Sequence, residues 1–394
     1  MRKVADRLTA LLLAAIILVF GGGTALKVKG PVLDIVRNEA VTDMPPAIEA
    51  SLTEKFKSRN NWINVNGLFQ RLIGVTVIRD AGDIDVFRMS NGQLTYEYPD
   101  CDMEYAAEEV TGLSECAQEN GAEFIYVQLP CKAYSDDLMP PGTHTYGYAD
   151  SDELCDALKE NGVRVLDLRE EIEKEGFDIP ELFFNTDHHW KPSTALWAAG
   201  VISEKLSDTV DGYFYDESIY DPDNYKKKTY KDWFLGSLGR RVGTLYGGVD
   251  DFDVITPRFD TDFHFYTESQ AADGKQKNRD GSFKKALMKL QYVKKKDYFS
   301  NLTYFTYLGN EYRLATVTNR LADNDKKILM LRDSFSCTLL PYMSLSAGEI
   351  TAIDMRYHTK LRIKEYIRDN DFDAVIIAYN PSMFREDGAF DFDR

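Results

Sequence analysis

The chain has 394 residues, of which 44% are hydrophobic and 28% charged, and its formal net charge at pH 7 is −17. This composition excludes a disordered chain and suits one large α/β domain with additions, or two domains. The negative charge and the lack of a long basic run argue against a nucleic-acid partner. The five cysteines show neither disulfide nor zinc spacing, so we expect mainly small buried residues at Cys101, Cys116, Cys131, Cys155 and Cys337.

An uncharged apolar stretch at residues 8–26 follows three basic residues that lie within the first seven positions. Its length just suffices to span a bilayer as a helix, which predicts a membrane anchor within residues 1–30. The alternatives are a signal peptide, cleaved among the small residues 21–25, and a buried core helix. Both membrane-targeting alternatives export everything after Lys27, so we expect an extracytoplasmic protein that is anchored to the cell membrane or secreted.

Residues 31–102 are predicted to form a linker followed by a small β-rich element. The Pro45-Pro46 pair interrupts the linker. Short apolar alternations then flank the Asn91-Gly92 pair, and this dipeptide favours a hairpin turn.

Helical and strand patterns alternate from about residue 103. Helical stretches are followed by short apolar runs at residues 124–129 and 163–168, and this order is typical of a parallel sheet. Residues 211–322 break the alternation with segments rich in Tyr, Asp and Lys, which indicate a β-rich insertion. The alternation then resumes, so residues 103–394 are predicted to form a three-layer α/β/α domain of flavodoxin-like type that carries this insertion.

Ser334 lies where the apolar strand of "ILMLRDSFS" gives way to a polar turn. Ligands of parallel sheets bind at the carboxyl ends of the strands, and a turn there offers backbone N–H groups to a developing negative charge. Ser334 is therefore a candidate nucleophile, although Asp333 or Ser334 capping the next helix is the alternative. Arg356 and Tyr357 end a neighbouring strand and are candidates for substrate contact, unless the arginine pairs with a local carboxylate.

The segment "TDHHW" places Asp187 two residues before His189. In an extended or turn conformation these side chains fall on one side, so the carboxylate can orient an imidazole that accepts a serine proton. A metal site formed by Asp187, His188 and His189 is an alternative, but no further ligand is indicated by spacing. A purely structural histidine is a third possibility. Trp190 suits either stacking on a sugar ring or packing in the core.

Three segments of the chain, in this order, resemble the DHHW protein family of exported bacterial proteins: "FFNTDHHWKPSTALWAAG", "FLGSLGRRVGTLYGGVDDFDVITPRF", and the run from "ILMLRDSFSC" to "DAVIIAYN". That family is similar to SGNH-hydrolase-like proteins of the periplasmic alginate O-acetyltransferase type. The resemblance implies an SGNH-type fold and an O-acetyltransferase or acetylesterase that acts on cell-envelope or extracellular polysaccharide. It implies a glycan substrate and a membrane partner that hands over the acyl group, and it requires no metal, nucleotide or other cofactor.

The resemblance also implies roles for individual residues. Asp187 corresponds to the residue that orients the base, His189 to the general base and Ser334 to the nucleophile. His188 occupies the variable position of the motif, so a supporting role or a contact with substrate is expected for it.

The oxyanion donors are less plainly indicated. The backbone N–H near Phe335 and the side chain of Asn380 are the candidates, and a plain turn before Pro381 is the alternative for the asparagine. Arg332 stands where a glycine usually precedes the Asp-Ser pair, which is expected to crowd the oxyanion hole. This departure supports the rival expectation, a non-catalytic protein that binds glycan or assembles envelope machinery on a degenerate SGNH scaffold.

Overall fold

The computed structural model describes residues 17–38, 48, 51, 55–56, 58–79, 84–270, 275–358 and 361–393. The chain divides into two compact units. The smaller unit consists of Met1–Gly74 with Val242–Tyr246, and the larger consists of Val75–Arg241 with Gly247–Arg394.

The smaller unit contains a π-helical turn, Ile17–Gly21, and the helices α2, Gly22–Asn38, and α4, Arg59–Leu72. Much of the predicted anchor, residues 8–26, lies outside the described residues. Within the part that is described, no helix is both long enough and apolar enough to cross a membrane. The anchor therefore stays a prediction. Helix α4 was not expected, because its sequence falls where a linker and strands were predicted.

The larger unit opens with a small antiparallel sheet of three strands, in the order β1-β2-β3. The strands are β1, Val77–Ile78, β2, Val86–Arg88, and β3, Leu94–Thr95. The Asn91-Gly92 turn joins β2 to β3, and Gly92 has a φ of 89°. This left-handed conformation is accessible to glycine without steric cost, which explains the glycine at the turn.

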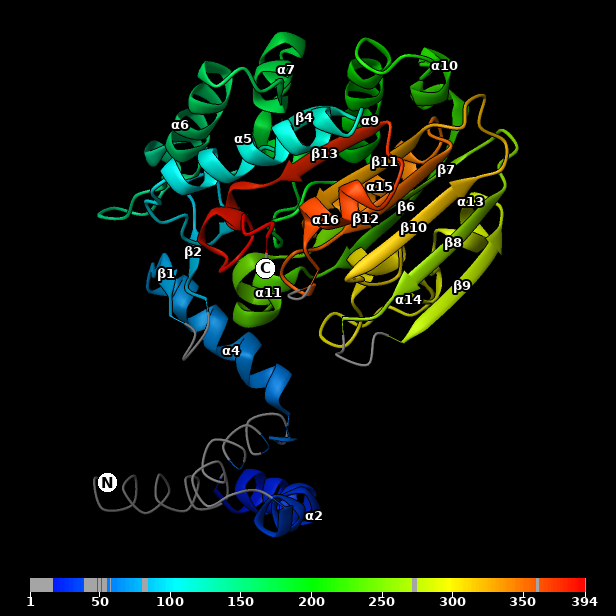
Figure 1. Ribbon diagram of the computed structural model, residues 1–394. Helices are drawn as coiled ribbons and strands as arrows, with labels where there is room; N and C mark the ends of the chain where they lie inside the picture. Colours follow the sequence, from blue (N-terminus) through cyan, green and yellow to red (C-terminus); the bar gives the residue numbers. More distant parts are fainter. Residues whose placement is uncertain are drawn as a thin grey trace, which may run out of the picture. The chain divides into compact units, whose positions relative to one another are not determined.

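An eight-stranded sheet with the order β5-β4-β13-β11-β12-β10-β8-β9 forms the centre of the larger unit (Figure 1). Its first five strands are parallel: β5, Val165–Asp167, β4, Glu123–Gln128, β13, Ala374–Tyr379, β11, Lys327–Arg332, and β12, Glu349–Ile353. The last three are antiparallel: β10, Leu314–Asn319, β8, Phe263–Glu268, and β9, Gln276–Gly281. These three strands come from the predicted insertion, which therefore extends the main sheet instead of forming a separate appendage.

The rest of the insertion contains a long hairpin of β6, Tyr225–Phe234, and β7, Asp250–Pro257. The same stretch of sequence contains short helices: α10, Glu217–Tyr220, η3, Pro222–Asn224, α11, Ser237–Val242, α12, Thr244–Gly247, α13, Phe283–Ala286, α14, Gln291–Lys294, and η4, Thr303–Thr306. The predicted β-structure is thus accompanied by several short helices, and two of them, α11 and η4, contribute residues to the candidate site.

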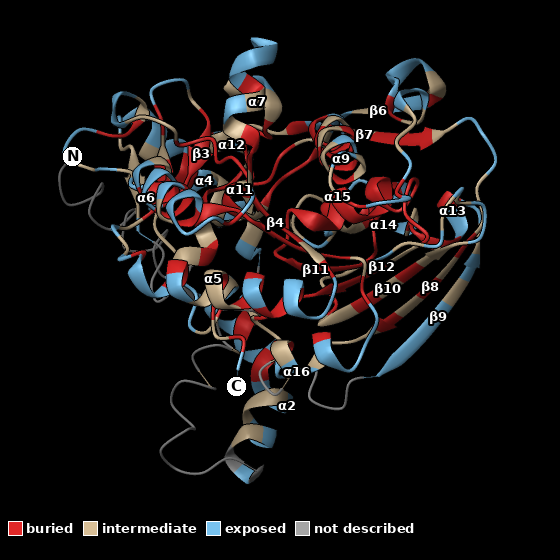
Figure 2. Cartoon of the chain, turned by 45° about the horizontal axis from the view of Figure 1, so that its top comes forward, coloured by how far each residue is buried: buried red, intermediate tan, exposed pale blue. Residues whose placement is uncertain are grey.

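Helices cover both faces of the parallel strands (Figures 1 and 2). Side chains alternate along β4: Phe124 and Tyr126 pack with α5 and α16, whereas Ile125 and Val127 pack with α9 and α15. Successive strand residues point to opposite faces, so this alternation follows directly from strand geometry. The helices are α5, Glu104–Glu119, α6, Gly147–Glu160, α7, Leu168–Glu175, α8, Ile179–Leu182, α9, Pro192–Ser207, α15, Ser336–Met343, and α16, Ile363–Arg368, with 3-10 turns η2, Asp136–Leu138, and η5, Pro381–Arg385. The predicted α/β/α layering around a large sheet is thereby confirmed.

The cysteines are all free thiols. Four of them are buried, and Cys101 is half-buried. They contribute small apolar volume to the core, as the scattered spacing predicts.

A buried cluster of charges lies at the carboxyl ends of β11 and β12. Arg332 is fully buried, its Nη2 donates to Tyr312 O at 2.5 Å, and its Nη1 lies 3.4 Å from Asp354 Oδ2. Arg356 donates to the same carboxylate at 2.9 and 2.7 Å. The Arg332 guanidinium is therefore engaged by a carbonyl group just before β10 and by a carboxylate just after β12.

We expect Asp354→Ala to lower the free energy of unfolding by about 3–5 kcal/mol, because it leaves Arg332 buried without its carboxylate. Urea unfolding monitored by circular dichroism measures this change. The control is Asp371→Ala at an exposed loop position, which should change stability by less than about 0.5 kcal/mol. Equal losses in both variants would show that the buried pair does not stabilise the fold.

Candidate active site

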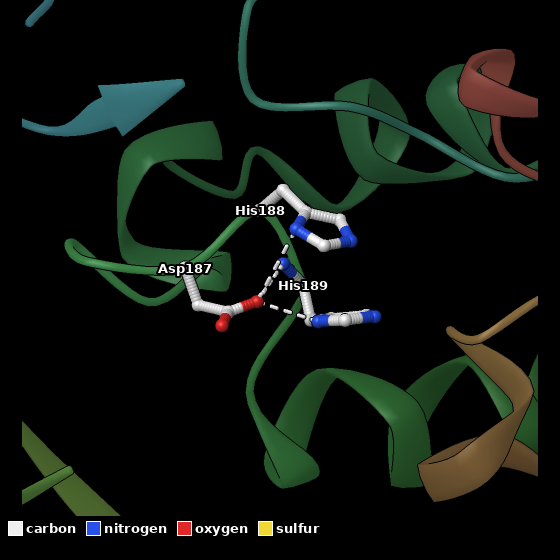
Figure 3. A group of neighbouring side chains, drawn as sticks. All are labelled: Asp187, His188 and His189. Carbon is white, nitrogen blue, oxygen red and sulfur yellow. Dashed lines mark hydrogen bonds and ion pairs between the residues drawn. The ribbon is translucent and has the colours of Figure 1, made fainter. Parts of the chain in front are cut away.

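The two adjacent histidines lie in a tight loop between α8 and α9. Phe183 and Trp190 form an isolated antiparallel bridge, and Phe184 N–H donates to His189 O at 3.2 Å. Pro192 occupies the first turn of α9, where its missing N–H costs nothing. The histidines therefore precede the helix, and Figure 3 shows their two rings beside the carboxylate of Asp187.

A continuous chain of hydrogen bonds runs from Asp187 through His189 to Ser334. His189 Nδ1 lies 2.5 Å from Asp187 Oδ1, and His189 Nε2 lies 2.8 Å from Ser334 Oγ. A proton on Nδ1 leaves Nε2 as an acceptor for the serine hydroxyl. The side chains come from the loop before α9 and from the turn after β11, so the sheet edge brings together residues that are distant in sequence.

The carboxylate of Asp187 is held in its ionised form. Burial acts to raise the pKa of Asp187, but the charge and hydrogen bond of His189 outweigh it. The backbone N–H of Ser237 donates to the second carboxylate oxygen at 2.5 Å and acts in the same direction. The pKa of Asp187 therefore lies well below its usual range, and the carboxylate can fix the ring of His189 over a wide range of pH.

His188 packs on the ring of His189, with centroids 3.8 Å apart, and its other face meets Tyr96 edge-on at 5.2 Å. Its Nδ1 lies 3.3 Å from Ser237 Oγ. Burial and the neighbouring charge of His189 lower the pKa of His188 well below its ordinary value. The side chain is 18% exposed, and a supporting role and contact with substrate both stay predictions for His188.

Asp187, His188 and His189 also offer ligand atoms that all lie within 4.8 Å of one another. Both ring nitrogens of His189 are used in hydrogen bonds, one to Asp187 and the other to Ser334. A metal ion at this position would have to displace at least one of these bonds to reach His189. The arrangement of donors thus suits proton transfer better than metal coordination.

A buried lysine binds the backbone of the loop that carries the two histidines. Lys132 is 1% exposed, and its Nζ donates to the carbonyl oxygens of Phe184 at 2.8 Å, Asn185 at 3.4 Å and Asp187 at 2.6 Å. Burial lowers the pKa of Lys132 to about 7, although the charges of nearby Asp250 and Asp187 oppose the shift. Sequence analysis missed this residue because an isolated lysine in "PCKAY" carries no motif.

Asp250 at the start of β7 binds the opposite polar groups of the same loop. Its carboxylate accepts the N–H groups of Asn185 at 2.7 Å and Thr186 at 2.8 Å, and the Thr186 hydroxyl at 2.5 Å. Gly236 lies so close that an added β-carbon would stand 2.3 Å from Asp187 Cβ. These contacts account for the second segment of the family resemblance, "FLGSLG…VDDF", which packs against the loop that carries Asp187 and positions its carboxylate.

Trp190 is fully buried and joins the histidine loop to the nucleophile turn. Its Nε1 donates to Phe335 O at 3.1 Å and to Thr338 Oγ1 at 2.9 Å. The prediction that Trp190 contacts substrate is wrong, because its ring has no exposed face on which a sugar can stack. The core alternative holds, and the indole N–H finds the partners that a buried tryptophan requires.

Tyr304 covers the imidazole from the insertion. Its ring is stacked on that of His189, with centroids 4.0 Å apart and planes at 19°, and its hydroxyl lies 3.2 Å from Ser334 O. One side chain of η4 thus contacts both the base and the turn that carries the serine. The aromatic segment "LTYFTYLGN" gave no signal that distinguished Tyr304 from its neighbours.

Both predicted oxyanion donors are engaged elsewhere. Phe335 N–H donates to Asp333 Oδ1 at 2.9 Å, and Asn380 Nδ2 donates to Pro130 O at 2.7 Å. Asn380 is fully buried, and its backbone N–H donates to Asp333 Oδ2 at 2.6 Å. The two predicted donors thus bond to other groups, because the carboxylate of Asp333 accepts the N–H of Phe335 and the carbonyl oxygen of Pro130 accepts the side-chain amide of Asn380.

Asp333 thus plays the capping part that was the alternative for this turn, and the hydroxyl of Ser334 remains free to meet His189. Burial raises the pKa of Asp333 to about 6, while the N–H of Asn380 acts against the shift. Among the described residues, we find no hydrogen-bond acceptor for the N–H of Ser334 itself. Among the described residues, the backbone N–H of Ser334 is therefore the hydrogen-bond donor nearest the nucleophile that is not already bonded to another group.

The two candidates beyond β12 are bound to local acids. Arg356 forms its paired hydrogen bonds with Asp354, and Tyr357 donates to Glu311 Oε2 at 3.0 Å. The Arg356 side chain is 20% exposed. Pairing with a local carboxylate, the alternative for this arginine, is what the structure contains, and contact with substrate stays a prediction for both residues.

Residues 92–221 match a family model described as the SGNH hydrolase-like domain of the acetyltransferase AlgX. No curated protein matches the chain. A structure of Bacillus cereus PatB1 with a sulfonyl adduct is 20% identical with a TM-score of 0.66, and the match covers 80% of this chain and 100% of that one. A DHHW family protein from Eubacterium siraeum is 19% identical with a TM-score of 0.57, covering 80% and 96%.

At these identities the solved structures show a shared fold. Together with the family model, they confirm the resemblance to the DHHW protein family and to SGNH-hydrolase-like proteins of the alginate acetyltransferase type.

Proposed function

We propose that the protein is an extracytoplasmic O-acetyltransferase that acetylates hydroxyl groups of a cell-envelope or extracellular polysaccharide through Ser334, His189 and Asp187. The observation that carries this proposal is the hydrogen-bond chain of 2.5 and 2.8 Å that links the three side chains. A hydroxyl needs a base within hydrogen-bond reach to become a nucleophile, and the base needs a third group to orient it. The match to a model named for an acetyltransferase supports the same class of reaction.

In the first half-reaction, Ser334 Oγ attacks the carbonyl carbon of an acetyl ester and its proton passes to His189 Nε2. The tetrahedral intermediate then expels the donor alcohol, which takes the proton from His189 and leaves an acetyl group on Ser334. Asp187 remains ionised and stabilises the imidazolium without accepting its proton.

In the second half-reaction, a sugar hydroxyl gives its proton to His189 Nε2 and attacks the acetylated serine. Collapse of the intermediate forms the new ester and returns the proton to Ser334 Oγ. If water takes the place of the sugar, the same steps release acetate, so the esterase differs from the transferase only in the acceptor.

The non-catalytic rival rests on one observation, the engagement of both predicted oxyanion donors by other groups. A site without such donors loses about 10²–10³-fold in rate for each donor removed. The Ser334 N–H remains as one donor. A glycan-binding protein with this scaffold would bind its ligand equally well with or without the serine hydroxyl.

We expect Ser334→Ala and His189→Ala each to lower the rate of acetyl release from an acetyl-ester reporter by about 10³-fold or more, since either change breaks the proton-transfer chain. Ser336→Ala is the matched control, because the Ser336 hydroxyl lies two residues from the nucleophile, is buried, and has no hydrogen-bond partner among the described residues. It should retain activity. Equal rates in the parent and all three variants would rule out Ser334 as the nucleophile.

A second readout does not depend on an acetyl donor. A sulfonyl fluoride reagent should add one sulfonyl group to Ser334, located by peptide mass spectrometry, and the adduct should be absent from Ser334→Ala. Adding oligosaccharide acceptors and measuring the masses of the products by mass spectrometry then distinguishes transfer to a sugar from hydrolysis. Labelling at other residues only, with glycan binding unaffected by Ser334→Ala, would favour the non-catalytic rival.

The pH dependence should depend on Lys132. Its protonated form donates to three carbonyl groups, and deprotonation near pH 7 leaves two donors for three acceptors. We therefore expect activity to fall as the pH rises through about 7 in the parent, and Lys132→Met to show a lower rate that lacks this fall.

Stability should change in the opposite direction. Because the pKa of Lys132 is lower in the folded protein than its ordinary value of 10.5, the unfolded chain binds more protons between about pH 7 and 10.5, and the free energy of unfolding rises with pH there. Lys132→Met should remove that rise, whereas the exposed control Lys226→Met should retain both trends. The same fall in activity in Lys132→Met as in the parent would assign it to another group.

A further inference from the structure

Helix α4 of the smaller unit carries an exposed apolar face. Trp62, Val65, Phe69 and Leu72 are 40%, 56%, 58% and 75% exposed. Their spacing of three and four residues places them on one side of the helix. Leu68 and Ile73 widen the same side and are also exposed. A contiguous apolar surface of this kind marks a site of interaction.

The opposite side of α4 is already packed within its own unit. A β-carbon at Gly67 would lie 2.1 Å from Val242 O, which shows how closely the two backbones approach. Asn64 Oδ1 accepts the N–H of Thr244 at 2.8 Å. The helix is thus fixed through its polar side, and its apolar side faces outward.

The charge around α4 differs from that of the whole chain. Residues 55–74, at the end of the first segment of the smaller unit, contain four basic and no acidic residues, whereas the chain has a net charge of −17. The basic residues are Lys55, Lys57, Arg59 and Arg71. An apolar face with aromatic residues and flanking basic groups is the pattern of a helix that lies in a membrane interface, where the basic groups meet anionic lipid headgroups.

The position of α4 relative to the predicted anchor agrees with this pattern. The ring of Phe20, within the apolar stretch 8–26, meets Trp62 edge-on with centroids 5.2 Å apart. A second copy of the chain is a poorer partner for this face, because pairing two such helices would bring two clusters of positive charge together.

We propose that α4 lies in the plane of an anionic bilayer, with Trp62, Val65, Phe69 and Leu72 among the acyl chains and the basic residues at the lipid phosphates. This placement is independent of the proposed chemistry at Ser334. It assigns the smaller unit a membrane-surface function beyond that of a linker.

The test uses the full chain with the half-buried Cys101 replaced by serine and one new cysteine that carries an environment-sensitive dye. Val65→Cys and Phe69→Cys place the dye on the apolar face. Asn60→Cys is the control on the opposite side of the helix, because Asn60 lies four residues before Asn64 and seven before Gly67. Each labelled protein is reconstituted in phosphatidylcholine vesicles that contain or lack phosphatidylglycerol.

We expect a blue shift of the emission on adding vesicles at positions 65 and 69 that is larger with phosphatidylglycerol and smaller at high salt, and little lipid-dependent shift at position 60. Replacing Phe69 and Leu72 with serine should remove the shift at position 65. No shift at 65 and 69, or an equal shift at 60, would overturn the proposal. Emission that depends on protein concentration and not on lipid would also overturn it and would indicate pairing of two copies.

Discussion

The hydrogen bond of 2.8 Å between His189 Nε2 and Ser334 Oγ joins two segments that are 145 residues apart in sequence. Each end has its own support. Ser334 follows β11, a buried strand with parallel neighbours on both sides, so its position is set by the rigid centre of the sheet. His189 lies in a loop without regular structure, and its position depends on side chains that bind the loop backbone.

That dependence explains the buried charges around the loop. A loop sealed from water must satisfy its own N–H and C=O groups, because each unpaired one is costly. Lys132 supplies donors to three carbonyl groups, and Asp250 accepts two N–H groups and a hydroxyl. The positive charge of Lys132 and the negative charge of Asp250 each lower the free-energy cost of burying the other. The carboxylate of Asp187 therefore remains available to orient His189. The geometry of the candidate site therefore depends on the stability of this polar network.

Periodicity and position were enough to predict the parallel strands, the turn at Ser334 and the pairing of Asp187 with His189. They were not enough for Lys132 or Tyr304, since a single lysine and one tyrosine among many acquire meaning only when distant segments meet. Trp190 was ambiguous for a related reason. The local sequence around an aromatic residue just before a helix does not show whether its side chain is exposed or buried. The antiparallel strands of the insertion were recognised as β-structure, but their addition to the main sheet depends on non-local pairing that no local pattern encodes.

The oxyanion donors depend on the same kind of non-local contact. Asp333 was weighed only as a cap, yet its two carboxylate oxygens accept N–H groups from Phe335, two residues on, and from Asn380, at the end of β13. This bridge fixes the nucleophile turn against the neighbouring strand and keeps Ser334 within reach of His189. In the proposed reaction, an acyl oxygen approaching Ser334 would therefore have to compete with a carboxylate for the N–H of Phe335. The raised pKa of Asp333, about 6, weakens that carboxylate as a competitor at mildly acidic pH, since a protonated carboxyl group is the poorer acceptor. In the proposed reaction, the bonds of Asp333 would thus have opposite effects on the two functions of this turn. They hold Ser334 in hydrogen-bond contact with His189, as proton transfer requires. They also occupy the Phe335 N–H that would otherwise bind the oxyanion.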